Sequence, residues 1–188
     1  MKLGDRGPEV LAFQQSVFPT NMCDGICGLD TFSRWRADND PTCPWQLRNM
    51  FRLIGKITTY SMANVTDTAD DCSGSVCLAL GISKAHGTAT NPTPLDFGTD
   101  GILADARGDE HVFTTISTDT MQPGDLLCYG RHDGHAGHVA FWLGDGNICD
   151  CSASENGVHA HKDTLAQFLV PHAGRPVYAL RFVGPRSV

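Results

Sequence analysis

The chain has 188 residues, of which 41% are hydrophobic and 19% charged, so it can bury a core and is not disordered by composition. The net charge is −7 at pH 7 without a block of like charges, which excludes the basic face that nucleic-acid binding requires. No stretch reaches the ~20 apolar residues of a membrane span. The polar start, Met1–Pro8, lacks the apolar segment of a signal peptide. We therefore expect a chain made in the cytoplasm, with no nucleic-acid partner and no membrane insertion.

The N-terminal segment predicts a small helical module. Pro8 stands where a helix would begin, and Val10 starts the apolar face of that helix. A turn at Asp24-Gly25 precedes a second short helix that we expect to begin at Thr31. Prolines and small polar residues over 40–44 then break the chain. This pattern indicates a module over residues 1–42 and a main domain over residues 45–188, or alternatively a helical cap of one larger domain.

The main domain predicts helices first and strands afterwards. Apolar residues at helical spacing favour a helix over 45–57, and Asp70-Asp71 are placed to cap a helix over 72–81. A loop is expected over 87–100 and a further helix over 162–169. The expected strands are 111–116, 125–129, 138–143, 147–151 and 177–182. A helix that carries a cysteine, followed by an antiparallel sheet that carries a histidine, is an α+β arrangement.

Cys72 and His138 form the candidate pair of nucleophile and base. A cysteine in the first turn of a helix faces unpaired backbone N–H groups and the positive end of the helix dipole, which favour the nucleophilic thiolate. His138 opens an otherwise apolar strand and so lies at the rim of the core, where a base can reach both a helix start and a substrate. The alternatives are one more buried cysteine and a strand-end histidine with no chemical role.

The remaining cysteines and histidines raise the alternative of a metal site. Eight cysteines in a chain of this length indicate mostly reduced, buried side chains. Three of them leave open one disulfide or a share in a zinc site: Cys23, Cys27 and Cys43. The histidines considered as zinc ligands are His132, His135, His138, His159 and His161. No zinc-protease motif such as HExxH accompanies them, so we expect no metal and no other cofactor.

Three motifs together resemble the NlpC-type cysteine peptidases of bacterial cell walls. They are Asp71-Cys72-Ser73-Gly74, Pro123-Gly124-Asp125-Leu126 and the run 138–146, and they follow one another in that family's order. The resemblance implies a papain-like fold, in which the helix bearing the cysteine packs on the antiparallel sheet bearing the histidine. It further implies a third catalytic residue on the next strand, where Asp150 stands. The residues that would hold the substrate's amino group are Tyr60, Asp71 and Ser73. The chain departs from the family in two places, because an aspartate at position 150 is unusual and the two glycines that normally follow the tyrosine region are missing.

Strand register decides whether Asp150 faces His138. A plain two-residue turn at Asp145-Gly146 would pair Asp150 with Phe141 and put its carboxylate on the sheet face opposite the histidine. The cysteines on either side of Asp150 would then share the histidine's face. A β-bulge, or a loop with an odd number of residues, would instead bring Asp150 to His138. There its charge would raise the pKa of the imidazole and favour a thiolate–imidazolium pair. The sequence leaves both registers open.

The N-terminal segment resembles a peptidoglycan-binding module through Gly7-Pro8-Glu9-Val10 and the run 24–28. The two resemblances imply a monomeric peptidoglycan hydrolase that cuts an amide bond of the stem peptide through Cys72 and His138. A phage endolysin released through a holin fits this expectation, and so does an injected antibacterial effector. Two alternatives remain: an N-acetylmuramoyl-L-alanine amidase or CHAP-type hydrolase with the same pair of residues, and, from another class, a non-catalytic wall-binding protein.

Overall fold

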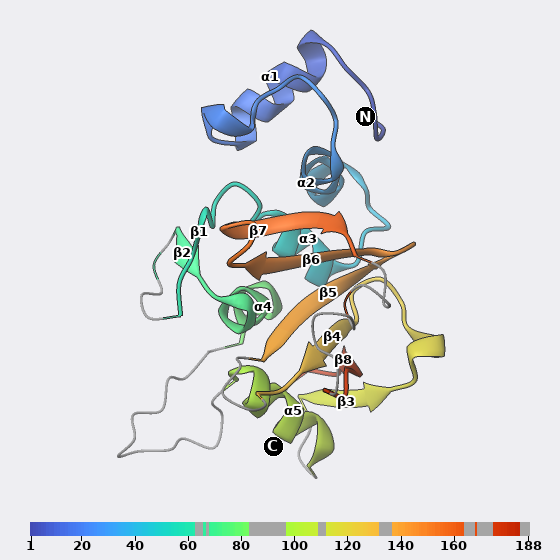
Figure 1. Cartoon of the computed structure of the whole chain (residues 1–188). Coiled ribbons are helices and arrows are strands. Elements are labelled where there is room, and N and C mark those ends of the chain that lie inside the picture. The colour runs from blue at the N-terminus through green and yellow to red at the C-terminus, as the bar shows by residue number, and fades with distance from the viewer. Residues whose placement is uncertain are drawn as a thin grey trace.

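The computed structural model describes residues 1–62, 66, 68–82, 97–108, 112–131, 137–163, 168 and 175–184 (Figure 1). The helices are α1 (Pro8–Val17), α2 (Leu29–Asn39), α3 (Trp45–Phe51), α4 (Cys72–Leu80) and α5 (Thr99–Arg107), with short 3-10 turns η1 (Thr20–Met22) and η2 (Thr118–Thr120). The strands are β1 (Thr59–Tyr60), β2 (Ala69–Asp70), β3 (Phe113–Ile116), β4 (Leu126–Tyr129), β5 (His138–Gly144), β6 (Asn147–Ser152), β7 (Gly157–Lys162) and β8 (Tyr178–Phe182). None of the helices in the described ranges has the length and apolar content that a membrane crossing requires.

A six-stranded antiparallel sheet forms the centre of the fold, in the order β3-β8-β4-β5-β6-β7. A separate parallel pair, β1 and β2, leads into α4. In Figure 1, α4 lies against the sheet at β5 and β6, α3 packs beside α4, and α5 lies beside β3 and β4. The expected α+β fold is confirmed, because the helix that begins with Cys72 packs on the antiparallel sheet whose β5 begins with His138.

Alternate residues of the central strands face opposite sides of the sheet, as the pleat of a strand requires. Val139 and Phe141 of β5 belong to the main core, which also takes in the buried side chains of α3 and α4. Ala140 belongs instead to a smaller apolar cluster with Tyr129 and Phe168. His138 shares the alternation of Ala140, and its ring centroid lies 6.0 Å from that of each of these two aromatic rings. The sheet thus places His138 among aromatic side chains at one end of β5.

Helix α4 begins at Cys72 because the carboxylates of two preceding residues accept backbone N–H groups there. The side chain of Asp71 accepts a hydrogen bond of 2.8 Å from the Gly74 N–H, which is the expected N-cap. Asp70 is fully buried, and its Oδ1 accepts the N–H of Asp71 at 2.8 Å. The helix ends at Gly81, whose φ of 68° is the left-handed conformation that glycine adopts without strain. The predicted cap and the predicted helix are therefore confirmed.

The N-terminal segment packs directly on the rest of the chain. Phe18 and Ala37 belong to the main hydrophobic core. Asp30 of α2 accepts hydrogen bonds from His159 Nδ1 at 2.7 Å and from the Ala160 N–H at 2.6 Å, both on β7. Figure 1 shows α2 between the sheet and α1, with α1 outermost. The division into a module over 1–42 and a domain over 45–188 stays a prediction.

Several element boundaries differ from the sequence-based expectation. The helix expected over 45–57 ends at Phe51, and the following turns include Gly55 at a φ of 77°, which a helix does not accommodate. The loop expected over 87–100 ends earlier than predicted, because α5 begins at Thr99. The buried side chains of Ile102 and Ala106 lie four residues apart, on one face of this helix. Residues 87–96 lie outside the described residues. Lys162 ends β7 instead of beginning a helix, and 164–167 and 169 lie outside the described residues. Four of the five predicted strands begin and end within one residue of their predicted bounds. The fifth, predicted over 111–116, is a strand over 113–116 in the structure.

We predict that Gly74→Ala lowers the free energy of unfolding by roughly 1–3 kcal/mol, the usual cost of forcing an extra methyl group into a packed site. A Cβ at this position would stand 1.8 Å from Asp70 Oδ1, and that carboxylate is held in turn by the Asp71 N–H. Urea unfolding followed by circular dichroism measures the loss. Leu78→Ala, on the same helix at a side chain 52% exposed, is the matched control and should cost much less. Equal losses for the two variants would contradict the close contact.

Candidate active site

The candidate nucleophile is the first residue of α4. Cys72 is 4% exposed, and it directly follows the β2 strand and the capping Asp71. This position leaves its backbone N–H at the start of the helix, where such groups have no partner within the helix itself. The fold therefore places this cysteine at the helix start that the sequence predicted for it.

His138 lies between the thiol and a carboxylate. Its Nε2 donates to Asp150 Oδ2 at 2.6 Å, and the Cys72 thiol lies close enough to the ring to raise the pKa of His138. Because Asp150 occupies Nε2, the Nδ1 atom is the one left for the thiol. The side chains of His138 and Asp150 are only 16% and 4% exposed, so water competes little for these bonds. His138 is thus bonded to Asp150 and stands beside Cys72.

A β-bulge brings Asp150 to this side of the sheet. Phe141 pairs with Cys149, but Gly144 pairs with Asn147, so the register shifts by one residue near the turn. Gly144 and the turn residues Asp145 and Gly146 have φ values of 88°, 51° and 71°. The shifted register puts Asp150 opposite Ala140, which shares the face of His138. The bulged alternative is therefore the one the structure has, and the unbulged two-residue hairpin is wrong.

The cysteines beside Asp150 point away from His138. Cys149 and Cys151 both belong to the main core on the other side of β6. The Cys151 thiol donates to the Asp70 carbonyl oxygen at 3.3 Å. All eight cysteines carry free thiols in this structure, so Cys23, Cys27 and Cys43 form no disulfide here.

Opposite pKa shifts accompany the contact between His138 and Asp150. Burial by itself lowers the pKa of His138, but hydrogen bonds to Asp150 and Cys72 outweigh burial and raise that pKa above its ordinary value of 6.5. Burial by itself raises the pKa of Asp150, but hydrogen bonds from two histidines lower it below its ordinary value of 3.8. The arrangement therefore favours a charged imidazolium beside a charged carboxylate at neutral pH.

His161 is the second histidine on this carboxylate, and the sequence analysis missed that role. Its Nε2 donates to Asp150 Oδ1 at 2.9 Å, so Asp150 bridges His138 on β5 and His161 on β7. The hydrogen bond to Asp150 raises the pKa of His161, against the opposing effect of burial. The sequence signal was the pair His159 and His161, which share one face of a strand and were weighed only as zinc ligands.

The residues expected to hold the substrate's amino group lie next to the thiol, and the side chains of Asp71 and Ser73 already have partners. Tyr60 pairs with Asp70 across β1 and β2, and burial together with the charges of Cys72 and Asp71 raises the pKa of its phenol. The Ser73 hydroxyl donates to Asp71 Oδ1 at 2.9 Å, the same oxygen that caps α4. Asp71 and Ser73 are 9% and 3% exposed. Their demonstrated role is to build the helix start, and binding of a substrate amine stays a prediction.

Two of the histidines considered as zinc ligands, His159 and His161, have carboxylate partners. Within the described ranges, no group of three histidine, cysteine, aspartate or glutamate side chains is placed to hold a metal ion. His132 and His135 lie outside the described residues. His159 and His161 each bind a different carboxylate, Asp30 and Asp150 respectively.

Residues 47–187, well over half of the chain, match the family described as bacteriophage peptidoglycan hydrolase. The chain therefore belongs to the bacteriophage peptidoglycan hydrolase family. Cell-wall peptidoglycan is accordingly the substrate class of the family to which the candidate site belongs. No protein with a curated description matches the chain.

Solved structures with similar folds include NlpC2 from Trichomonas vaginalis, at 17% identity and a TM-score of 0.45, covering 77% of this chain and 48% of that one. An NlpC/P60 family protein from Bacillus cereus has 17% identity and a TM-score of 0.48, covering 76% and 41%. The peptidoglycan hydrolase RipB from Mycobacterium tuberculosis has 19% identity and a TM-score of 0.45, covering 97% and 74%. The chain spans less than half the length of the first two. Family membership rests on the match along the sequence.

We predict that His161→Gln destabilises the protein most at low pH. A folded-state pKa above the unfolded value contributes stability that is fully present below about pH 6.5 and is lost as the pH rises through the raised pKa. The variant should therefore cost roughly 1–2 kcal/mol at pH 5.5, as expected for a hydrogen bond between charged groups, and progressively less at higher pH. Urea unfolding at pH 5.5, 7.0 and 8.5 measures this trend.

The neighbouring exposed residue supplies the control for this variant. Lys162→Gln removes a positive charge from the same strand, where no contact with Asp150 is present, and should show little effect at any of the three pH values. A loss for His161→Gln that is equal at all three would contradict a charged His161–Asp150 pair.

Proposed function

We propose that this peptidoglycan hydrolase cuts an amide bond of the cell-wall stem peptide with Cys72 as the nucleophile. The observation that carries the proposal is the position of His138, which bonds Asp150 and stands beside Cys72 at the start of α4. A nucleophile, a base within reach of it and a third group that orients the base are the parts that covalent amide hydrolysis requires.

The chemistry follows from the order of these groups. His138 takes the thiol proton of Cys72 through Nδ1, and the thiolate sulfur attacks the carbonyl carbon of the amide. The carbonyl oxygen becomes an oxyanion, which the Cys72 N–H at the start of α4 stabilises. The C–N bond then breaks, and the imidazolium of His138 gives its proton to the leaving amine. A water molecule, deprotonated by His138, attacks the thioester and releases the carboxylic acid and Cys72. Asp150 holds the imidazole in the required orientation throughout.

The bond and the biological setting belong to the same proposal. We assign an endopeptidase acting within the stem peptide, with Tyr60, Asp71 and Ser73 at the substrate's amino end, and a monomeric phage endolysin that reaches the wall of its host through a holin. No cofactor takes part in these steps. An amidase that cuts beside the sugar, or an injected antibacterial effector, would use the same three residues. Mass spectrometry of digested purified peptidoglycan distinguishes an endopeptidase from an amidase by the new termini.

The N-terminal segment supplies the second part of the proposal. Residues 1–42 would add affinity for intact walls, as their resemblance to peptidoglycan-binding modules suggests. The contacts of Asp30 with β7 would hold this segment in a fixed place beside the candidate active site. Specific contacts are needed for wall binding because a chain with a net charge of −7 is repelled by wall polyanions.

We predict that Cys72→Ala abolishes the release of soluble peptides from purified peptidoglycan and leaves the melting temperature within a few degrees of wild type. The substitution removes the attacking sulfur and little else. Cys77→Ala, on the same helix and equally buried, is the matched control and should keep activity. Residual lysis by Cys72→Ala, or loss of wild-type lysis on adding EDTA alone, would rule out the thiol mechanism.

We predict that Asp150→Asn lowers kcat at least about tenfold, since the orienting carboxylate of such a triad has large effects on turnover. The alkaline limb of the pH–rate profile should move to lower pH, because Asp150 contributes to the raised pKa of His138 and the neutral amide does not. Cys149→Ala, one residue away on the opposite face, should leave turnover and profile unchanged. An Asp150→Asn enzyme with the wild-type profile would remove Asp150 from the catalytic group.

A further inference from the structure

A cavity of about 400 Å³ lies where the N-terminal segment meets the rest of the chain. This volume is within the range for ligand pockets, about 300–1,000 Å³. Three stretches of the chain line this junction cavity: η1 with the proline before it, the link from α3 to β1, and the turn from β6 into β7. The N-terminal segment and the main part of the chain therefore both contribute to its walls.

Direct contacts between these stretches fix the walls of the junction cavity. Asp30 of α2 binds His159 Nδ1 at 2.7 Å, which joins the N-terminal segment to β7. A backbone N–H of β7 donates to the Ile57 carbonyl oxygen at 3.0 Å, which joins β7 to the link before β1. Gly55 of that link lies so close to the Phe18 ring that a Cβ there would stand 2.6 Å from it. The cavity is therefore preformed, and its shape does not depend on ligand binding.

The polar side chains of the lining include both hydrogen-bond donors and acceptors. The hydrogen bond to Asp30 raises the pKa of His159, against the opposing effect of burial, and so favours the imidazolium. Because Asp30 occupies Nδ1, the protonated Nε2 is the donor left for a ligand. The Glu155 carboxylate is an acceptor, and the amides of Asn21 and Asn156 can donate or accept. This mixture suits a ligand that has an amide group and hydroxyl groups.

Charge favours an uncharged ligand in this cavity. Among the described residues that line it there is no lysine or arginine, and the charge of His159 is matched by Asp30. The remaining carboxylate, Glu155, would repel the carboxylates of a stem peptide. The other part of peptidoglycan is a glycan strand of N-acetylated sugars, whose rings and acetamido groups are uncharged. Pro19 and Met22 also give the lining apolar surface that a methyl group can contact.

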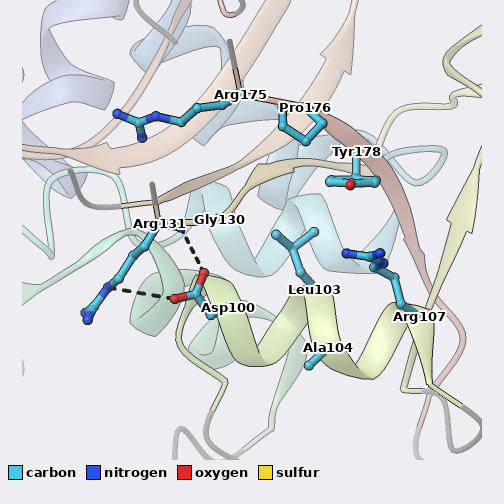
Figure 2. Close-up of a pocket in the computed structure, with 9 residues that line it drawn as sticks. All are labelled: Asp100, Leu103, Ala104, Arg107, Gly130, Arg131, Arg175, Pro176 and Tyr178. Atoms are coloured by element: carbon cyan, nitrogen blue, oxygen red, sulfur yellow. Dashed lines mark hydrogen bonds and ion pairs between the residues drawn. The ribbon is translucent and has the colours of Figure 1, made fainter. Parts of the chain in front are cut away.

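A second cavity, of about 320 Å³ beside α5 and β4, has a different lining (Figure 2). It is lined by three arginines, Arg107, Arg131 and Arg175. Figure 2 shows their side chains pointing apart, so one anion cannot contact all three. This basic cavity therefore offers no common site for an acidic group.

The short strand β1 connects the junction cavity to the candidate active site. Thr58 lines the cavity, and two residues later burial together with the Cys72 charge raises the pKa of the Tyr60 phenol. Asn156, which also lines the cavity, accepts the Tyr60 N–H through Oδ1 at 3.2 Å. Thr59 and Asn156 are exposed, so the surface between the two places is open to solvent. Two residues of an extended strand advance about 7 Å, a distance that the first residues of a stem peptide can span.

We propose that the junction cavity binds an N-acetylated sugar of the glycan strand, next to the stem peptide that is cut. The acetamido carbonyl accepts a hydrogen bond from His159 Nε2, its N–H donates to the Glu155 carboxylate, and its methyl group contacts Met22. The side-chain N–H groups of Asn21 and Asn156 bind ring hydroxyls. This inference rests on the proposed function for the attached peptide, and it adds the sugar as a second recognised part of the substrate. The N-terminal segment and the main part of the chain then bind one sugar together.

Titration with a sugar that carries no peptide tests the junction cavity separately from catalysis. The probe is tri-N-acetylchitotriose, added to the full, isotope-labelled Cys72→Ala chain while its amide signals are followed by NMR. Cellotriose is the matched ligand, because it is equally uncharged and has hydroxyl groups in place of the acetamido groups. We expect the acetylated trisaccharide to move the signals of cavity residues and to bind at least about tenfold more tightly than cellotriose. Glu155→Gln and Asn21→Ala, both at exposed side chains, should each weaken its binding severalfold.

An acidic residue outside the cavity provides the control. Asp119→Asn removes one negative charge from an exposed side chain on η2 and should leave the affinity unchanged. Equal affinity for the two trisaccharides, equal effects of Glu155→Gln and Asp119→Asn, or a sugar-free stem peptide that moves the same cavity signals overturns the sugar site. Hydrolysis of peptidoglycan by the chain with an intact Cys72 is scored in parallel. Sugar binding without hydrolysis would retain the site and refute the proposed function, whereas hydrolysis without sugar binding would do the reverse.

Discussion

The candidate active site depends on one buried carboxylate. Asp150 is 3% exposed, and a charge removed from water to that extent costs several kcal/mol unless hydrogen bonds replace the water. His138 and His161 provide those bonds from β5 and β7, the strands on either side of β6. The same charge that must be satisfied therefore aligns three neighbouring strands and fixes the imidazole of His138. Structural and chemical demands thus meet in this one carboxylate, which helps to orient the candidate base His138.

Buried carboxylates that accept hydrogen bonds also build the start of α4. Asp70 and Asp71 are adjacent acidic residues in an almost water-free position, which would be unfavourable if either lacked hydrogen bonds. Each accepts backbone N–H groups at the turn between β2 and α4. Gly74 permits this packing because any larger residue would collide with the Asp70 carboxylate. The thiol of Cys72 is thereby held in a rigid helix start, and its partner His138 approaches from the end of a rigid strand.

Charge is distributed unevenly over the molecule, and this distribution bears more on substrate binding than the net charge does. A net charge of −7 argues against attraction to a polyanionic wall over long distances. The three arginines that line the cavity beside β4, Arg107, Arg131 and Arg175, are a local exception to this acidic balance. At the other end of the molecule, His159 and Asp30 join β7 to α2, so the N-terminal helices share in the packing of the sheet.

The sequence by itself determined the capped helix at Cys72, the strand that begins at His138 and the α+β order, since capping and alternation are local properties of neighbouring residues. It left the face of Asp150 open because one bulged residue between Trp142 and Gly144 reverses every side chain beyond it. Only the tertiary structure showed that His161 shares the Asp150 carboxylate and that Asp30 receives His159, because these partners are separated by 11 and 129 residues along the chain. Helix α5 was missed for a related reason: its apolar face is short, and packing beside β3 and β4 stabilises it.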